Sequence, residues 1–329
     1  MNPLAIGITA GDPNGIGPEI ALRAALRPQP ARRRLVLIGH REVWERAARQ
    51  IGRTLPPETP DLEPPLPRRC TWDPDMAPPP ADRPGQVRAD AARAAYAYIL
   101  SATAAALNGR LAALVTAPIC KAAFQKAGLR EPGHTELLAR LTGTRRYAMM
   151  LFGDRIRVVL ATRHLPLRQV ADALTADAVV EAVELLARAL PWMGFRRARI
   201  GVCGLNPHAG DGGALGDEEK TVIAPALARC RRRGFDVAGP IPADAIFHQH
   251  LAGKYDAVVA MYHDQGLGPM KMLSFDSGVN LTLGLPIVRT SPDHGTAFDL
   301  AGQGRASPAS MNAALDWAAR LAARKNPWA

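Results

Sequence analysis

The stretch Asp256–Lys271, DAVVAMYHDQGLGPMK, indicates the fold class. Its run from Ala257 to Met261 is short, apolar and rich in valine, which is typical of a strand that helices cover on both faces in a parallel sheet. The run then ends in His263 and Asp264. Ligands of open α/β sheets bind at the carboxyl ends of the strands, so we expect these polar residues at a ligand-accessible edge. A surface histidine followed by a capping aspartate is the alternative, and this stretch alone favours neither.

Strand-like runs alternate with helical patterns along the 329 residues, which predicts an α/β protein with a largely parallel sheet. Examples of strand-like runs are LAIGITAG (4–11), RLVLIGH (34–40) and ARIGVCGLN (198–206). A closing helix is expected from Ser307 to Lys325, because Pro308 lies in its first turn and basic residues lie in its last. The length suits two domains of ordinary size.

The composition excludes several classes of protein. The net charge of +11 is spread over short, scattered clusters without interleaved aromatic residues, so we expect no nucleic-acid binding and instead a cationic site for an anionic metabolite. The four cysteines are far apart and form no C-x-x-C pair, which favours buried thiols in a reducing compartment. The chain has neither a signal-like start nor an apolar run of about 18 residues, so we expect a cytoplasmic protein without a membrane partner.

The segment from Pro56 to Pro84 interrupts the alternation and holds 11 of the 29 prolines. Proline lacks the backbone donor that a helix or a central strand needs. We therefore expect an extended surface excursion with little chemistry.

Three strand-like runs end in a histidine: IRVVLATRHLPL brings His164, IGVCGLNPHAGDGG brings His208 and AVVAMYHDQG brings His263. One such histidine is more often structural, but equivalent strand ends converge on a common crevice. Three neutral imidazoles can hold a divalent metal and leave a coordination position open for substrate. Asp264 could orient such a ligand or exchange protons. The histidines without this context are expected at the surface: His40, His248 and His250.

Other residues suit an anion. In EPGHTELLARL, His134 and Thr135 open a predicted helix whose free N–H groups favour a phosphate or carboxylate. Lys271 follows the third histidine, and Asn280 and Arg289 lie on the next extended run. The lysine and the arginine could also be ordinary solvated surface charges. Against this, Arg289 ends the apolar run LPIV, which favours a place at the edge of the sheet.

Two glycine-rich segments, GDPNGIGPE (11–19) and DHGTAFDLAGQGRASP (293–308), lack the G-x-G-x-x-G dinucleotide fingerprint. Their spacing indicates only tight turns and close backbone approach, which is a weak signal for a nucleotide.

Taken together, GDPNGIGPE, GHTE, HLPL, NPHAGDGG, MYHDQG and VNLTLGLPIVRTSPDHGTAFDLAG resemble the 4-hydroxythreonine-4-phosphate dehydrogenase family of vitamin B6 biosynthesis. The glycine-rich ends also resemble isocitrate and isopropylmalate dehydrogenases. The resemblance implies a two-domain α/β/α fold of that type and a homodimer. Residues 1–133 with 280–329 would form the cofactor side, and residues 134–279 would form the metal, substrate and dimerisation side. The active site would lie in the cleft and at the dimer interface.

The resemblance also implies roles for individual residues. The ligands of one divalent metal ion per site (zinc, magnesium or cobalt), contributed by both subunits, would be His164, His208 and His263. The substrate contacts would be His134, Thr135, Lys271, Asn280 and Arg289. The catalytic groups would be Asp244, Asp264 and Lys271. The contacts to NAD or NADP would be Gly11, Asp12, Gly15, His294, Gly295 and Thr296.

The implied reaction oxidises the C3 hydroxyl of 4-phosphooxy-L-threonine with NAD(P)+ to a β-keto acid, which loses carbon dioxide to give 3-amino-2-oxopropyl phosphate. Three rivals remain open. The first two are dehydrogenases of erythronate or threonate 4-phosphate and of cis-dihydrodiols. The third, from another class, is a tris-histidine metal-dependent hydrolase or a protein that merely binds a metabolite. Intact GHTE and NPHAGDGG favour the vitamin B6 enzyme without excluding a sugar-acid phosphate.

Overall fold

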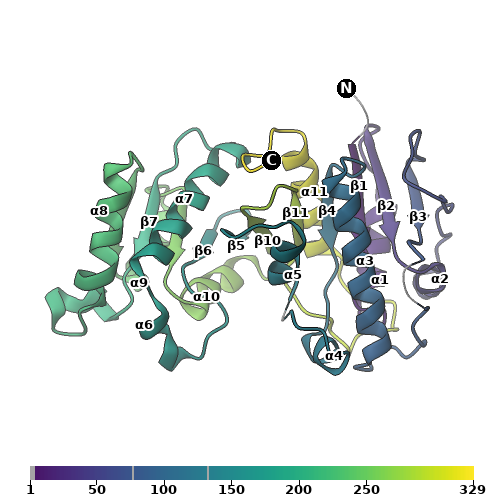
Figure 1. Cartoon of the computed structure of the whole chain (residues 1–329), viewed down its shortest axis with the longest axis horizontal. Coiled ribbons are helices and arrows are strands. Elements are labelled where there is room, and N and C mark those ends of the chain that lie inside the picture. Colours follow the sequence, from purple (N-terminus) through teal and green to yellow (C-terminus); the bar gives the residue numbers. More distant parts are fainter. Residues whose placement is uncertain (1–3, 76–77, 132) are drawn as a thin grey trace. The chain divides into compact units, whose positions relative to one another are not determined.

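The computed structural model describes residues 4–75, 78–131 and 133–329, and the chain divides into two compact units. Unit 1 comprises Met1–Arg145 and Leu285–Ala329, and unit 2 comprises Arg146–Gly284. The sequence placed the boundaries after residues 133 and 279. Helix α5 (His134–Leu141) packs against helix α3 (Ala89–Leu107), so it falls in unit 1. Figure 1 labels most of the elements of each unit.

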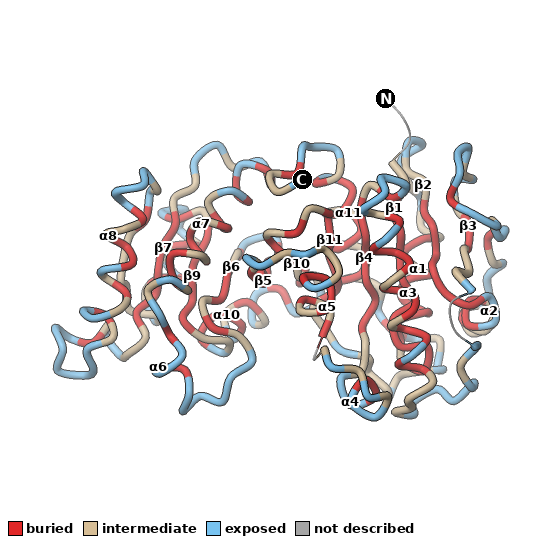
Figure 2. Tube along the Cα trace, viewed as in Figure 1, coloured by how far each residue is buried: buried red, intermediate tan, exposed pale blue. Residues whose placement is uncertain are grey.

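Unit 1 contains a fully parallel sheet. Its strands, in spatial order, are β3 (Arg69–Trp72), β2 (Arg33–Ile38), β1 (Leu4–Thr9), β4 (Ala113–Thr116) and β11 (Arg289–Pro292). Figure 2 shows buried stretches along β1, β2 and β4. Such near-continuous apolar runs are expected for parallel strands that are covered on both faces.

Helices α1, α3 and α11 pack on this sheet. The helices of unit 1 are α1 (Gly17–Leu26), α2 (Arg41–Gln50), α3, α4 (Lys121–Lys126), α5 and α11 (Ala309–Ala322). Many of the buried residues of α3 are alanines, and small side chains let a helix lie close to a sheet. The predicted C-terminal helix is observed as α11, which begins after Pro308.

The proline-rich segment 56–84 is only partly a surface excursion. It contains the edge strand β3, in which Cys70 and Thr71 are buried, and it also buries Leu62. An edge strand tolerates flanking prolines because one of its sides needs no hydrogen-bond partners, whereas a central strand would not. Residues 76–77 of this segment and residue 132 of the EPGHTELLARL motif lie outside the described residues, as do residues 1–3.

Unit 2 contains a mixed sheet. Its strands, in spatial order, are β10 (Val279–Leu283), β5 (Ala148–Phe152), β6 (Arg157–Leu160), β9 (Ala257–Ala260), β7 (Ile200–Cys203) and β8 (Val237–Ile241). The pairs β10–β5 and β5–β6 are antiparallel. The run β6–β9–β7–β8 is parallel, so these four strands end at one edge of the sheet.

Helices α7, α9 and α10 pack against β6, β7 and β9, and they enclose a core that includes Leu151, Val158 and Val258. The helices of unit 2 are α6 (Val170–Ala173), α7 (Ala176–Met193), α8 (Ala224–Arg232), α9 (Ala243–Leu251) and α10 (His263–Ser274). These units confirm the predicted α/β class with largely parallel sheets. Among the described residues, every helix is too short or too polar to span a bilayer.

Candidate active site

Five of the predicted polar residues of unit 2 follow four neighbouring strands. His164 follows β6, His263 and Asp264 follow β9, His208 follows β7, and Asp244 lies in the first turn of α9, just after β8. Because β6, β9, β7 and β8 are adjacent and parallel, all five side chains belong to the carboxyl edge of one sheet. This is the arrangement that the strand-end pattern predicted.

His164 and His263 lie close together, with their ring centroids 5.5 Å apart. His263 Nδ1 contacts Asp264 Oδ1 at 2.7 Å. A neutral imidazole that donates its Nδ1–H to a carboxylate presents the lone pair of Nε2, which is how metal-ligating histidines are usually oriented. The two rings are therefore placed to supply part of a metal site, with the carboxylate orienting the ring of His263.

The third histidine sits on a strained turn. The 3-10 turn η2 (Pro207–Gly213) has positive φ values at six successive residues, among them His208 at 53° and Asp211 at 41°. Among the described residues of one chain, no group of three or more His, Cys, Asp and Glu side chains could hold a metal. The structure thus pairs two of the predicted ligands, and His208 as the third ligand stays a prediction.

Two of the predicted substrate residues meet in unit 1. Arg289 is only 2% exposed, and its Nε and Nη2 donate to Thr116 Oγ1 at 3.1 and 2.7 Å. Burial lowers the pKa of this guanidinium to about 9, so it still carries its charge at neutral pH. Burial, and next the charge of Arg289, lower the pKa of His134 well below its usual range. A buried cation beside a neutral imidazole suits a phosphate or a carboxylate.

The surroundings of Arg289 differ from the expectation. The residue begins β11 instead of ending a strand, and it is buried instead of lying at a rim. The apolar run before it is not a strand, because β10 ends at Leu283 and β11 starts at Arg289. His134 and Thr135 do open a helix, as predicted, and His134 Nε2 is buried without a hydrogen-bond partner among the described residues.

Lys271 and Asn280 belong to unit 2. Lys271 lies on α10, two turns after His263, with its Nζ 5.6 Å from the centroid of the Phe275 ring. Asn280 lies on β10, and its Oδ1 is buried without a hydrogen-bond partner among the described residues. A buried acceptor without a partner is unfavourable in the absence of a ligand, so Asn280 is suited to accept a hydrogen bond from one.

The two glycine-rich segments meet in unit 1. Ile16 N donates to Thr296 O at 3.0 Å, and a Cβ at Gly15 would lie 2.9 Å from the same oxygen. A Cβ at Gly11, where φ is +68°, would lie 2.4 Å from Pro118 O. Both glycines are therefore required by the chain's own packing. Gly295 is exposed with open space around it, which leaves this pair of turns accessible to a cofactor.

Asp12 is buried among these predicted cofactor residues. Its Oδ1 accepts a hydrogen bond from Asn14 N at 2.9 Å, while its Oδ2 has no partner among the described residues. Burial raises the pKa of this carboxyl group to about 6. Because only 1% of Asp12 is exposed, its role in this structure is to shape the turn. A direct contact with NAD or NADP stays a prediction.

The expectation for the remaining histidines is wrong at two of three positions. His40 and His250 are each only 3% exposed, whereas His248 is exposed as predicted. His40 Nδ1 bonds to Tyr98 OH, and His250 Nδ1 bonds to the carbonyl oxygen of Tyr255. Both are satisfied core histidines, because each imidazole finds a partner within the fold.

Comparisons with known proteins identify the family of this chain. The family model "Pyridoxal phosphate biosynthetic protein PdxA" matches residues 31–318. This chain belongs to that family. A relative from Pseudomonas putida, named 4-hydroxythreonine-4-phosphate dehydrogenase, is 44% identical, and the match covers 98% of this chain and 99% of the relative. A relative from Pectobacterium atrosepticum, named D-threonate 4-phosphate dehydrogenase, is 42% identical over 96% of this chain and 99% of its own.

A solved structure of the Klebsiella pneumoniae 4-hydroxythreonine-4-phosphate dehydrogenase is similar to this PdxA-family chain with a TM-score of 0.83. It is 41% identical, and the match covers 97% of this chain and 99% of that one. The family assignment thus rests on both sequence and fold over nearly the full length.

Sequence reasoning missed three buried polar residues beside the candidate histidines of this PdxA-family chain: Thr162, Glu219 and Gln265. Glu219 Oε1 accepts hydrogen bonds from the backbone N–H groups of Leu205 and Asn206 at 2.7 and 2.8 Å, at the start of the loop that carries His208. The motif letters MYHDQG contained one signal, a glutamine two residues after a strand-end histidine. Glu219 gave no such signal, because the run DEEK (217–220) is typical of the start of an ordinary helix.

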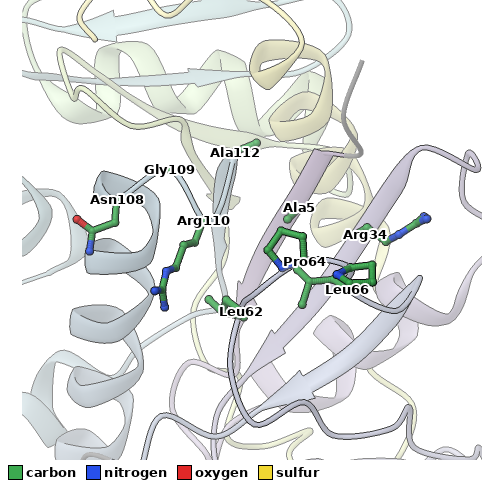
Figure 3. Close-up of a pocket in the computed structure, with 10 residues that line it drawn as sticks. Ala5, Arg34, Leu62, Pro64, Leu66, Asn108, Gly109, Arg110 and Ala112 are labelled. Carbon is green, nitrogen blue, oxygen red and sulfur yellow. The ribbon is translucent and has the colours of Figure 1, made fainter.

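Unit 1 also contains a cavity of about 480 Å³, which lies near the amino ends of β1 and β2. Figure 3 shows its lining residues, which include Ala5, Arg34, Leu62 and Arg110. None of the predicted site residues lines it. The cavity therefore shares no lining residue with the candidate active site.

Proposed function

We propose that this chain is an oxidoreductase that oxidises 4-phosphooxy-L-threonine with NAD or NADP to 2-amino-3-oxo-4-phosphooxybutanoate. This product then decarboxylates to 3-amino-2-oxopropyl phosphate in pyridoxal phosphate biosynthesis. The relatives named as dehydrogenases of phosphorylated hydroxy acids support the reaction class. The observation that carries the proposal is the row of histidines on β6, β9 and β7, because three strand ends converge there on one edge. A cytoplasmic location accords with this metabolic role.

His164, His208 and His263 would hold one divalent ion: zinc, magnesium or cobalt. Such an ion supplies Lewis-acid chemistry, which stabilises the negative charge on the substrate oxygen during oxidation and decarboxylation. Asp264 holds the ring of His263 through the Nδ1 contact. Asp244 and Lys271 are the remaining candidates for proton transfer.

Arg289, His134 and Thr135 would bind the phosphate or carboxylate of the substrate. The guanidinium keeps its charge in a site from which water is largely excluded, and an anion there meets little screening. Such remote contacts hold the reacting carbon in place, so their binding energy serves the chemical step. Asn280 would add a polar contact to the substrate.

NAD or NADP would lie along the two glycine-rich turns that carry Gly11, Asp12 and Gly15 and His294, Gly295 and Thr296, and that meet where Thr296 contacts Gly15 and Ile16. The cofactor supplies the hydride acceptor. The chain's own contribution is the rigid close approach of the two turns, which fixes the surface on which the cofactor rests.

A homodimer with shared active sites is part of the proposal. Of the seven large apolar side chains exposed in the described part of the chain, six lie on the segments that follow the three histidines. These six are Leu165, Leu167, Leu215, Met272, Leu273 and Phe275. Exposed apolar side chains gathered around one functional region favour a protein partner, and a second copy would bring its own histidine loops to the same place.

The test incubates the purified protein with metal, NAD+ or NADP+ and 4-phosphooxy-L-threonine, and it follows the absorbance of the reduced cofactor. We expect turnover that a chelator abolishes and added metal restores. D-Threonate 4-phosphate and erythronate 4-phosphate serve as parallel substrates, because the relative at 42% identity is named for the first of them. A kcat/KM higher for either sugar-acid phosphate would replace the proposed substrate. Substrate loss without cofactor reduction would support the hydrolase alternative.

A further inference from the structure

One hydroxyl group, that of Thr116, holds the buried guanidinium of Arg289. Thr116 Oγ1 accepts hydrogen bonds from Nε at 3.1 Å and from Nη2 at 2.7 Å. These two N–H groups lie on the same edge of the planar guanidinium, so a single oxygen fixes the direction in which that edge points. Both side chains are buried, so water has no ready access to replace the hydroxyl.

The pairing of β4 with β11 brings these two side chains to one face of the sheet. Arg289 pairs with Leu114 in the parallel ladder, and Thr116 lies two residues further along β4. Residues two apart on a strand point to the same face, so the side chain of Arg289 extends forward to Thr116. Because Thr116 is the last residue of β4, the guanidinium reaches the carboxyl end of that strand although Arg289 itself begins β11.

The first turn of α5 lies near the same guanidinium. Burial, and next the charge of Arg289, lower the pKa of His134. Burial lowers the pKa of Arg289 to about 9, and the charge of Glu136 opposes this effect. Such charge effects weaken with distance, so both side chains of α5 lie close to the guanidinium. An anion that meets Arg289 would therefore also meet the start of α5, and all of these residues belong to unit 1 of one chain.

Loss of the Thr116 oxygen would change where the charge of Arg289 points. Two buried N–H groups without an acceptor are unfavourable, so the guanidinium would turn toward other acceptors. A guanidinium binds an oxyanion best when its N–H groups already point at the place that the oxyanion takes, because less ordering is then needed on binding. The hydroxyl is therefore placed to preorganise the cation.

We propose that Thr116 is a positioning residue that holds the guanidinium of Arg289 in the direction in which it binds the anionic group of the substrate. This inference rests on the proposed function, because it takes Arg289 as an anion-binding residue. Thr116 acts through Arg289 and needs no contact with the substrate. Its contribution is one acceptor oxygen, so serine should keep the role and valine should lose it.

The variant Thr116→Val replaces the hydroxyl with a methyl group of similar size, and Thr116→Ser keeps the oxygen. The control is Thr290→Val, the same exchange at a fully buried threonine of β11, whose Oγ1 donates to Ala314 O of α11 at 2.8 Å. The full-length proteins are titrated with inorganic phosphate at constant ionic strength, and binding is followed by the phosphorus NMR line width. Arg289→Gln defines the part of the binding that depends on the guanidinium. Circular dichroism is recorded for every variant.

We expect Thr116→Val to bind phosphate at least about 10-fold more weakly, which is the range for a lost hydrogen bond to a charged group. Thr116→Ser and Thr290→Val should keep an affinity near that of wild type. In turnover of 4-phosphooxy-L-threonine, Thr116→Val should raise KM more than it lowers kcat, because the loss concerns binding of the anion. If Thr116→Val fails to fold, Thr116→Cys, which has a similar size and only a weak acceptor, carries the same expectation.

Two kinds of result would overturn the inference in distinguishable ways. Wild-type phosphate affinity in folded Thr116→Val, or an equal loss in Thr116→Ser or Thr290→Val, assigns the threonine to packing alone, and the proposed function stands. A wild-type protein that binds phosphate no better than Arg289→Gln removes Arg289 from the anion site. The inference then falls together with that part of the proposed function.

Discussion

At the scale of single residues, the chemistry of each candidate group is set by one or two neighbours. His263 Nδ1 contacts Asp264 Oδ1, an orientation that turns Nε2 toward a metal. Burial, and next the nearby charge of Arg289, lower the pKa of His134 well below its usual range, so its ring is neutral. The same side chain is thus suited to ligate a metal in one place and to hydrogen-bond an anion's oxygen in the other.

His208→Ala should abolish turnover while leaving the protein folded, because the side chain is exposed on a turn and contributes little to the core. We expect kcat to fall by a factor of about 100 or more, as for other lost metal ligands. His248→Ala, the exchange of an exposed histidine on α9, is the control and should retain wild-type kcat. Wild-type activity of His208→Ala with zinc, magnesium or cobalt added would refute the metal assignment.

The buried Asp12 predicts a pH-dependent stability. Its pKa rises from 3.8 to about 6 on folding, so the folded state holds the proton more tightly than the unfolded state. Stability from this group is therefore present below about pH 4, is lost as the pH rises to 6, and stays lost above it. Asp12→Asn has no titrating group at this position. The unfolding free energy of the variant minus that of wild type should therefore rise by about 2 to 3 kcal/mol from pH 4 to pH 7.

Urea unfolding at the two pH values measures this difference directly. Parallel pH dependence in the variant and the wild type would show that Asp12 is ionised in the folded state without cost, contrary to its burial.

At the scale of elements, the sequence located the strand ends well but not the tertiary surroundings of the residues on them. The alternation of apolar runs identified β6, β7 and β9, because both the strand period and the histidines are local features. Arg289 was misplaced, since whether a charged residue can be buried depends on Thr116 of a neighbouring strand. Gln265 and Glu219 were missed for the same reason: their partners lie on other segments, and a single sequence does not show them.

The meeting of two loops in unit 1 is an element-scale feature that glycine makes possible. Gly11→Ala would place a Cβ 2.4 Å from Pro118 O, whereas Gly128→Ala has the same left-handed backbone with nothing within 4 Å. Both variants lose stability because alanine disfavours a positive φ. The difference between their losses of unfolding free energy therefore measures the steric overlap at Gly11. We expect Gly11→Ala to lose at least about 2 kcal/mol more unfolding free energy than Gly128→Ala, as overpacked sites do. Equal losses in chemical denaturation would contradict this close approach.

At the scale of the whole molecule, the two units divide the predicted tasks. Unit 1 holds the buried arginine and the paired glycine-rich turns, and unit 2 holds the strand-end histidines. The chain brings only two of its histidines together among the described residues, which is consistent with ligands drawn from a second subunit. Fold class could be predicted from the sequence, because alternation is repeated along the whole chain. The homodimer was implied by the family resemblance alone and stays a prediction, because no local pattern reveals which apolar side chains the fold leaves exposed.

Met272→Asp should weaken the proposed dimer and lower activity together. The side chain is 88% exposed on α10, and a carboxylate there would be desolvated in an apolar interface. We expect the mass in solution to shift from twice 35.2 kDa toward 35.2 kDa by sedimentation velocity. Leu107→Asp, the exchange of an exposed apolar residue of unit 1, is the control and should remain dimeric. A monomeric wild type with full activity would contradict the shared site.

We propose that one metal-dependent site oxidises and decarboxylates a phosphorylated hydroxy acid. Reduced cofactor and carbon dioxide are measured in the same reaction with 4-phosphooxy-L-threonine, using metal-free and metal-loaded protein. We expect equal molar amounts of both products with metal and neither without it. Substrate consumed without reduced cofactor, or full turnover by the metal-free protein, would contradict it.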